Sequence, residues 1–221
     1  MKVVAYVPIK TNNQRLPGKN TKTFDDGTPL CSLLFNSLNN CSNIDEKYCF
    51  CSDVSIKEYL PQGITFLQRD SSLDSSSTLC NDIISSFISN VDADVYVLTH
   101  VTSPFLKTKT IEKCVDKVTA EGYDSAFTVS RIYDFLWDSN RQPVNFDPTC
   151  TVRSQDLEPL FKETNGVFVF TKDVFKRTNR RVGLNPYMCE VNELEAIDIN
   201  IPTDFDLANS VYMGGNAVER Y

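Results

Sequence analysis

The fold is decided at the start of the chain, by residues 3–20, VVAYVPIKTNNQRLPGKN. Three valines and a tyrosine among the first five of these residues are typical of a buried β-strand over residues 3–7. The polar loop that follows carries Lys10, Arg15 and Lys19 and has no acidic residue. A strand that ends in a cation-rich loop is typical of a polyphosphate site, although no Walker A pattern occurs. The residues alone also leave open a solvent-exposed loop with three scattered cations.

The composition of the chain sets limits on its class. The 221 residues carry a formal net charge of -7, with 41% hydrophobic and 23% charged residues. This is the composition of an ordinary globular protein, and the length predicts one domain over residues 1–221. An acidic chain argues against general nucleic-acid binding, which needs a basic surface. The cations of the first loop therefore stand out as a local site for an anion.

The sequence also bears on the cellular location of the protein and on the state of its cysteines. No hydrophobic run is long enough to span a membrane, and only a few apolar residues follow Met1-Lys2. We therefore expect a cytoplasmic protein with no membrane partner. The eight cysteines form no C-x-x-C pair, and His100 is the only histidine. This pattern favours reduced, mostly buried thiols over a zinc site.

Strand-like and helix-like segments alternate along the chain, which predicts an α/β sandwich with a mostly parallel central sheet. The expected strands are residues 3–7, 48–52, 64–67, 94–98, 125–129, 165–170 and 196–200. The expected helices are residues 29–39, 55–59, 78–89, 110–119, 173–177 and 202–212. The alternation breaks between residues 131 and 164, where Trp137, three prolines and mixed charges predict an excursion from the sheet.

Four later segments place polar residues beside the predicted elements. They are QRDSSLDSSS at 68–77, THVTSP at 99–104, RSQDL at 153–157 followed by NGVF at 165–168, and EAIDINIPTDFDLA at 195–208. Open α/β sheets bind ligands at the carboxyl ends of their strands, so we expect several of these segments near the first loop. The residues alone leave open an ordinary helix N-cap at Ser76 or Ser77. They also leave open a surface salt bridge from Arg153 to Asp156 or Glu158.

Together with RLPGKN at 15–20, these segments resemble the signature motifs of the sugar-acid cytidylyltransferases, the CMP-N-acetylneuraminate synthetases and the related CMP-Kdo synthetases. The resemblance covers nearly the whole chain. It implies a three-layer nucleotide-binding sandwich of the nucleotide-diphospho-sugar transferase type, with an excursion at 131–164 that packs against a second subunit in a homodimer. The implied reaction joins CTP to a 2-keto sugar acid, a sialic acid or related nonulosonic acid, and releases pyrophosphate, for surface glycan biosynthesis.

The resemblance also implies roles for individual side chains. It implies Lys10, Arg15, Lys19 and Asp198 as catalytic residues, and Asn20, Arg69, Ser76 and Ser77 as nucleotide-binding residues. It implies His100, Thr102, Ser103, Arg153, Gln155 and Asn165 as residues that bind the sugar acid. Asp198 and Asn200 would hold Mg²⁺.

Four positions depart from the family pattern. Lys10 stands where the family has arginine, Gln14 where the sialic acid branch has lysine, and His100 where a glutamine faces the sugar. Asn200 replaces an aspartate, and its amide neutralises less metal charge than a carboxylate. These departures leave open a CMP-Kdo-type or divergent enzyme with another acceptor, or an inactive nucleotide-binding paralogue. A glycosyltransferase is a further alternative, because DAD at 92–94 has the D-x-D form, although it precedes its strand.

Overall fold

A computed structural model describes residues 1–150 and 152–215 of the protein. One twisted sheet runs through it. Its strand order is β3-β2-β1-β4-β6-β5-β7. The strands are β1 (Val3–Ile9), β2 (Glu46–Cys51), β3 (Thr65–Gln68), β4 (Val95–Thr99), β5 (Ser125–Ile132), β6 (Leu160–Thr171) and β7 (Pro186–Glu190). Only β6 runs against its two neighbours, β4 and β5. The predicted α/β fold with a mostly parallel sheet is therefore confirmed.

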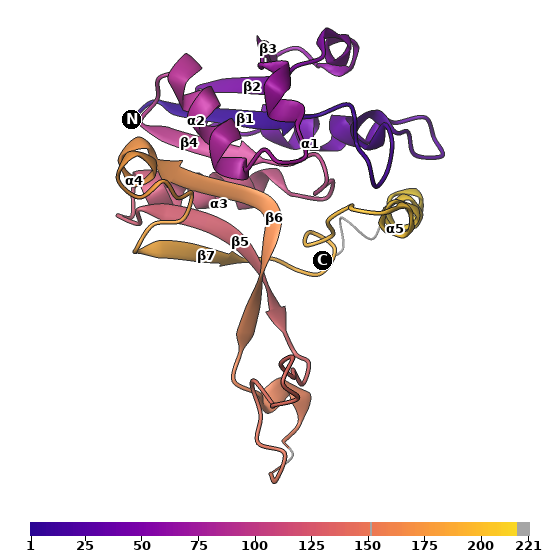
Figure 1. The fold of residues 1–221 in the computed structure, drawn as a ribbon, viewed down its shortest axis with the longest axis vertical. Coiled ribbons are helices and arrows are strands. Elements are labelled where there is room, and N and C mark those ends of the chain that lie inside the picture. The colour runs from indigo at the N-terminus through magenta and orange to yellow at the C-terminus, as the bar shows by residue number, and fades with distance from the viewer. Residues whose placement is uncertain (151, 216–221) are drawn as a thin grey trace.

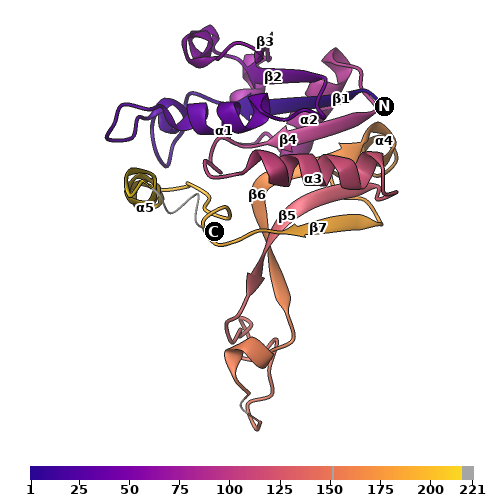
Figure 2. The ribbon, with the colours of Figure 1, turned by 180° about the vertical axis from the view of Figure 1, so that it is seen from behind.

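Helices cover both faces of the sheet and make it the middle layer of three (Figure 1; Figure 2). They are α1 (Leu30–Asn39), α2 (Cys80–Asn90), α3 (Thr108–Thr119), α4 (Lys172–Thr178) and α5 (Pro202–Met213). Short 3₁₀ turns are η1 (Lys19–Thr21), η2 (Val54–Tyr59), η3 (Ser71–Asp74) and η4 (Ser154–Asp156). Figure 1 shows α2 and α4 on one face, and Figure 2 shows α1 and α3 on the other.

Strand β1 lies in the interior because both of its faces are apolar. Val7 and its alternating neighbours pack in the core beneath α1 and α3, whereas Tyr6 points to the other face and stacks on Phe87 of α2 at 4.0 Å between ring centroids. A strand that is covered on both sides reads as a continuous hydrophobic run, which is the pattern quoted at the start. The loop after β1 is thereby fixed at the carboxyl edge of the parallel strands.

One strand was missed and one predicted strand is absent from the described residues. Strand β7 was not predicted, because its short sequence PYMCE begins with proline. The strand forms nevertheless, because it lies at the edge of the sheet, where a proline at the first position removes no hydrogen bond between strands. Residues 196–200 were predicted as a strand but pair with none. Their backbone instead lies against the loop after β4, where Ile199 N donates to the Thr102 carbonyl at 2.8 Å.

The expected excursion is an arm that leaves the body where β5 and β6 extend beyond the sheet (Figure 1). Residues 133–150 and 152–159 form its end. Phe135 and Trp137 pack edge-on against Phe146, with ring centroids 5.0 and 5.2 Å apart, yet Trp137 is 56% exposed. A role of this arm in dimerisation stays a prediction.

Most of the cysteines are buried, as expected. All eight cysteines are free, and only Cys80 and Cys150 are exposed. Among the helices of the described residues, none is both long and apolar enough to cross a membrane.

Candidate active site

The loop after β1 is folded by its own turn. Gly18 has a φ of 65°, a left-handed conformation that glycine adopts without a steric penalty, and η1 follows it directly. Asn20 braces the loop by donating its Nδ2 to the Lys10 carbonyl at 2.8 Å. This turn directs Lys19 into the protein, where its side chain is only 8% exposed.

The first loop meets the segment before α5. Lys19 Nζ donates to the Ile199 carbonyl at 2.7 Å. Arg15 donates to Asn200 Oδ1 at 2.9 Å, and Asn200 Nδ2 donates to Asp198 Oδ2 at 2.7 Å. Residues about 180 positions apart in the sequence therefore form one polar cluster, with two cations beside one carboxylate.

Asp198 is held ionised in this cluster. Burial works against its charge, but the side chains of Thr102, Asn165 and Asn200 and the Lys19 ammonium together keep its pKa below the ordinary value. Asn165 Nδ2 donates to Asp198 Oδ2 at 2.9 Å. Its other oxygen, Oδ1, is buried and has no hydrogen-bond partner among the described residues. An unpartnered anionic oxygen is a ready ligand for a cation.

The environment of Lys19 disfavours its charged form, whereas that of Asp198 favours the charged form. Burial lowers the pKa of Lys19, and the neighbouring Arg15 lowers it further, while Asp198 and Asp204 oppose the shift. A negative ligand placed between Lys19 and Arg15 would relieve their repulsion. The cluster is therefore suited to a polyanion.

A second polar cluster lies at the other end of the same sheet edge, around Arg69. Arg69 is 2% exposed, donates to the Ile9 carbonyl at 2.9 Å and forms an ion pair with Asp74. Lys10 Nζ donates to the Asp74 carbonyl at 2.7 Å. The Arg69 Nε is buried without a partner among the described residues. Asp74 was not among the predicted site residues, although it holds both predicted cations.

A pocket of about 360 Å³ opens over this second cluster. Its polar lining comprises Lys10, Arg69, Ser75, Ser76, Thr78, Cys80 and His100. Ser77 is exposed, and its hydroxyl lies 2.8 Å from that of Ser75. The alternative of a serine N-cap is wrong, because Leu79 occupies the cap of α2 and its N–H bonds to Asp82 at 2.8 Å.

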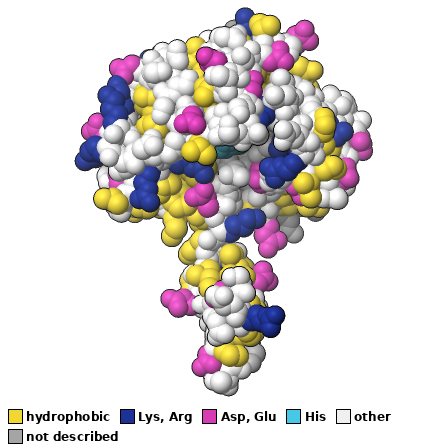
Figure 3. All heavy atoms as spheres, viewed as in Figure 1, with side chains coloured by type: hydrophobic (Ala, Val, Ile, Leu, Met, Phe, Trp, Pro, Cys, Tyr) yellow, Lys and Arg dark blue, Asp and Glu magenta, His cyan; other side chains and the backbone are white. Residues whose placement is uncertain are grey.

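His100 lies between the two clusters and lines the pocket. Its Nδ1 is 3.0 Å from the Asn165 carbonyl, and a carbonyl only accepts, so Nδ1 carries the proton. The neutral ring then has an acceptor lone pair at Nε2. Burial, together with the charges of Arg181 and Lys19, lowers the pKa of His100 to about 4. Figure 3 shows this histidine at the floor of a hollow flanked by basic side chains.

The depressed pKa of His100 predicts a pH-dependent stability. The unfolded chain takes up this proton near pH 6.5, while the folded protein does so only near pH 4, so stability is lost as the pH falls between these values. For the wild type, we expect the His100 contribution to the unfolding free energy to fall by about 2 kcal/mol between about pH 7 and about pH 5. Urea unfolding of the wild type and of His100→Gln at both pH values measures the difference. An equal decrease in the two proteins would contradict a His100 ring that the fold keeps neutral.

The remaining predicted residues divide between the body and the arm. Thr102 and Ser103 form the turn after β4, and Ser103 N donates to the His100 carbonyl at 3.0 Å. Arg153 and Gln155 lie on the exposed arm, and Arg153, 74% exposed, pairs with Asp156 at 2.7 Å. The arm projects away from α5 and from the segment before it, which carries Asp198 (Figure 1). The surface salt bridge left open for Arg153 is the one observed.

Arg181 is a cation near the pocket that the sequence reasoning missed. It follows α4, donates to Cys80 Sγ at 3.5 Å, and lowers the pKa of His100 through its charge. Its sequence surroundings, NRR after a short helix, are those of an ordinary basic helix end. No local signal could have found it.

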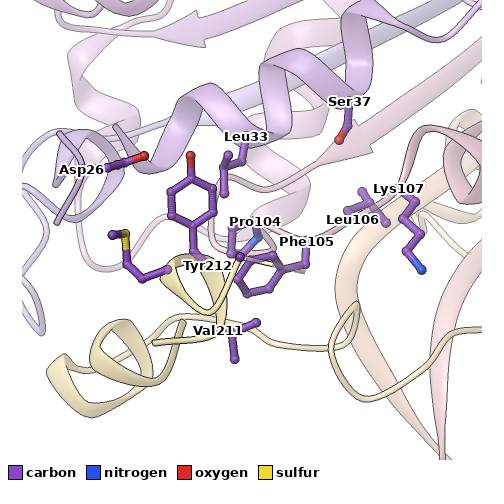
Figure 4. A pocket seen from close by; sticks show the side chains of 11 residues that line it. Asp26, Leu33, Ser37, Pro104, Phe105, Leu106, Lys107, Val211 and Tyr212 are labelled. Atoms are coloured by element: carbon purple, nitrogen blue, oxygen red, sulfur yellow. The ribbon is translucent and has the colours of Figure 1, made fainter. Parts of the chain in front are cut away.

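A separate and larger pocket of about 610 Å³ lies between α1, the loop after β4 and the end of α5. Its lining is mostly apolar, with Phe105, Leu106, Val211 and Tyr212 among the side chains (Figure 4). It does not contain the cations of the first loop. We therefore place the candidate site at the two polar clusters.

The comparison with protein families agrees with this geometry. The family model described as "Cytidylyltransferase" matches residues 4–214. The chain belongs to the cytidylyltransferase family. An N-acylneuraminate cytidylyltransferase A from Danio rerio is 32% identical over 145 residues, which are 62% of this chain and 33% of that protein. A CMP-N,N'-diacetyllegionaminic acid synthase from Legionella pneumophila is 24% identical over 233 residues and is matched over 96% of both chains.

A solved structure shows the same fold for this cytidylyltransferase. A CMP:2-keto-3-deoxy-manno-octonic acid synthetase complexed with CTP superposes with a TM-score of 0.72 at 13% identity, over 97% of this chain and 99% of that one. At this identity the likeness concerns the fold alone. The chain spans one third of the Danio rerio relative and about half of other N-acylneuraminate cytidylyltransferases.

Proposed function

We propose that this cytidylyltransferase joins CTP to a 2-keto sugar acid, a sialic acid or related nonulosonic acid, and releases pyrophosphate. The observation that carries the proposal is the meeting of Lys19 and Arg15 with Asp198 at the carboxyl edge of the sheet. Two cations and an ionised carboxylate in one partly buried cluster match a triphosphate that carries its own cation. The 360 Å³ pocket beside it would receive the rest of the nucleotide.

The chain's own residues would act by positioning and by charge. In the proposed reaction, the anomeric oxygen of the acid attacks the α-phosphorus in line and releases its hydroxyl proton to solvent, while the bond from the α-phosphorus to pyrophosphate breaks. Lys10, Arg15 and Lys19 would stabilise the negative charge that develops on the phosphate oxygens. Asn20 would keep the loop in place, since its amide already bonds to the Lys10 carbonyl. Arg69, Ser76 and Ser77 would contact the nucleotide.

The residues present fit a magnesium ion. Among the described residues, no group of three or more acidic, histidine or cysteine side chains could hold a metal by itself. Mg²⁺ needs only one or two protein carboxylates when substrate phosphates complete its shell, and Asp198 Oδ1 is available. When bound, Mg²⁺ would neutralise charge on the triphosphate and the leaving pyrophosphate. Asn200 as a second ligand stays a prediction, because its oxygen would have to leave Arg15.

The acceptor would lie on the His100 side of Asp198. Asn165 contacts both residues, and Thr102 and Ser103 form the adjoining turn. Nonulosonic acids are favoured because the relatives include N-acylneuraminate and diacetyllegionaminic acid enzymes. A Kdo-like octulosonic acid is the second candidate, since a synthetase for that acid shares the fold.

Pyrophosphate release tests the proposal. Purified protein is incubated with CTP, Mg²⁺ and, in turn, N-acetylneuraminate, N,N'-diacetyllegionaminate and Kdo, and pyrophosphate is measured with a coupled assay. We expect release to require both CTP and one of these acids, with ATP and GTP as control nucleotides. Background release with every acid would reject the proposal in favour of a nucleotide-binding paralogue. Transfer from a CMP-sugar without use of CTP would favour a glycosyltransferase.

We further propose that the protein is a cytoplasmic homodimer in which the arm contacts a second copy. The support is the exposure of Trp137, Tyr133 and Val144 on a projecting element, since exposed apolar clusters mark interaction sites. Such contact would bring Arg153 and Gln155 to the partner's site. Light scattering should give twice the chain mass of 25.0 kDa, and Trp137→Asp should halve it. A wild-type mass equal to one chain would refute this arrangement.

A further inference from the structure

Arg181 occupies a defined position beside the proposed acceptor site. It lies between α4 and β7, where Asn179 ends α4 with a left-handed φ of 52° and turns the chain back. The Asn179 carbonyl accepts from Asn81 Nδ2 of α2 at 2.7 Å, which ties this turn to the helix beside the pocket. The backbone of the loop is therefore braced close to Arg181.

The guanidinium of Arg181 is also fixed. It lies over the Phe168 ring of β6, 3.6 Å from the centroid, so its plane is supported by stacking. NH1 donates to Cys80 Sγ at 3.5 Å, and NH2 pairs with Glu163 at 2.9 Å. The side chain nevertheless keeps 24% of its surface exposed. A guanidinium that is held in this way and is still partly exposed has lost much of its conformational freedom before any ligand binds.

His100 and the Phe168 ring under Arg181 belong to neighbouring parts of the sheet. His100 follows β4, and Phe168, which lies beneath Arg181, is in the adjacent strand β6, where it pairs with Leu98 of β4. The Phe168 ring stands edge-on to the His100 ring, with the two centroids 6.4 Å apart. Lys10 follows β1 on the other side of β4. The lateral order is thus Lys10, His100, Arg181, with the phosphate-binding cations at one end and Arg181 at the other.

We propose that Arg181 binds the carboxylate of the acceptor while His100 Nε2 accepts a hydrogen bond from the hydroxyl on the same carbon. In the ring form of a 2-keto sugar acid, these two groups share the anomeric carbon. A fixed cation next to a neutral hydrogen-bond acceptor is complementary to that pair. The proposal rests on the proposed function and names the side chains that recognise its acceptor.

Glu163 is compatible with this role. Its side chain is 45% exposed, so it can turn into solvent when a substrate carboxylate takes its place beside Arg181. Until then it orients the guanidinium. The pair therefore keeps the site ordered in the absence of the acceptor.

Steady-state kinetics of Arg181→Gln tests the proposal, with Arg180→Gln as the matched control, since Arg180 is the exposed neighbour of the same type. Both are assayed by pyrophosphate release with whichever acid of the panel the wild type uses. We expect Arg181→Gln to raise the KM for the acid about 10-fold to 100-fold and to change the KM for CTP less than about 2-fold. Arg180→Gln should match the wild type.

A carboxylate-free acceptor separates recognition from a general structural effect. The wild type should discriminate against the C1 amide of the acid by about 10-fold or more, and Arg181→Gln should lose this preference. Wild-type kinetics in Arg181→Gln, or an unchanged preference for the free acid, would overturn the inference while the proposed function stands. Absence of activity in the wild type with every acid would instead reject the proposed function.

Discussion

Asp198→Asn is expected to lower kcat by roughly 1000-fold, which corresponds to about 4 kcal/mol of lost transition-state stabilisation. The change keeps the size of the side chain but removes the carboxylate whose charge acts most strongly on Lys19. It also replaces the buried Oδ1, which lacks a protein partner, with a group that binds a cation poorly. Turnover is measured as pyrophosphate release at saturating CTP and acid.

Asn200→Asp is the informative companion of that variant. If the amide limits metal binding, a carboxylate at this position should lower the Mg²⁺ concentration needed for half-maximal rate. Arg15, which now donates to the Asn200 oxygen, should pair with the new carboxylate and keep it in place.

For Asp198→Asn itself, a kcat within about 10-fold of the wild type would show that the Asp198 carboxylate is not part of the chemistry.

Lys19→Gln is expected to have the second largest effect, a loss of about 100-fold to 1000-fold in kcat/KM for CTP. Lys19 is the buried cation of the cluster, and low exposure makes its charge more effective than that of a surface lysine. The glutamine can still donate to the Ile199 carbonyl, so the fold should be retained. Kinetics at varied CTP, with a thermal melt as the folding check, measures the change.

Lys22→Gln is the control for Lys19→Gln. Lys22 closes the same turn but is exposed, and its ammonium lies over the Phe205 ring at 4.8 Å, away from Asp198. Its loss should leave kcat/KM for CTP within about 2-fold of the wild type. Equal effects of the two substitutions would mean that overall charge, and not the position of Lys19, governs CTP use.

The local pattern of the sequence determined much of this fold. The buried strand β1, the turn at Gly18 and the helix beginning at Pro202 follow from hydrophobic periodicity and from backbone preferences. Asn200 donates to Asp198 although their segment is not the predicted strand, because the loop after β4 holds its backbone at Ile199.

Features that depend on tertiary contacts could not be predicted in this way. Strand β7 carries a weak edge-strand sequence, and its place is set by pairing with β5. Arg181 lies close enough to lower the pKa of His100 because the turn after α4 is tied to α2. The orientation of Asn200 depends on Arg15, which is 185 residues away in the sequence. Each of these needs a partner that local patterns do not specify.

Calorimetric titration of CTP, with Mg²⁺ or with excess EDTA, tests the central claim that a triphosphate binds between Lys19 and a cation on Asp198. We expect removal of Mg²⁺ to weaken CTP binding by the wild type about 10-fold or more, and Asp198→Asn to lose most of this metal dependence. CTP binding that is equally tight with and without Mg²⁺ in both proteins would contradict it.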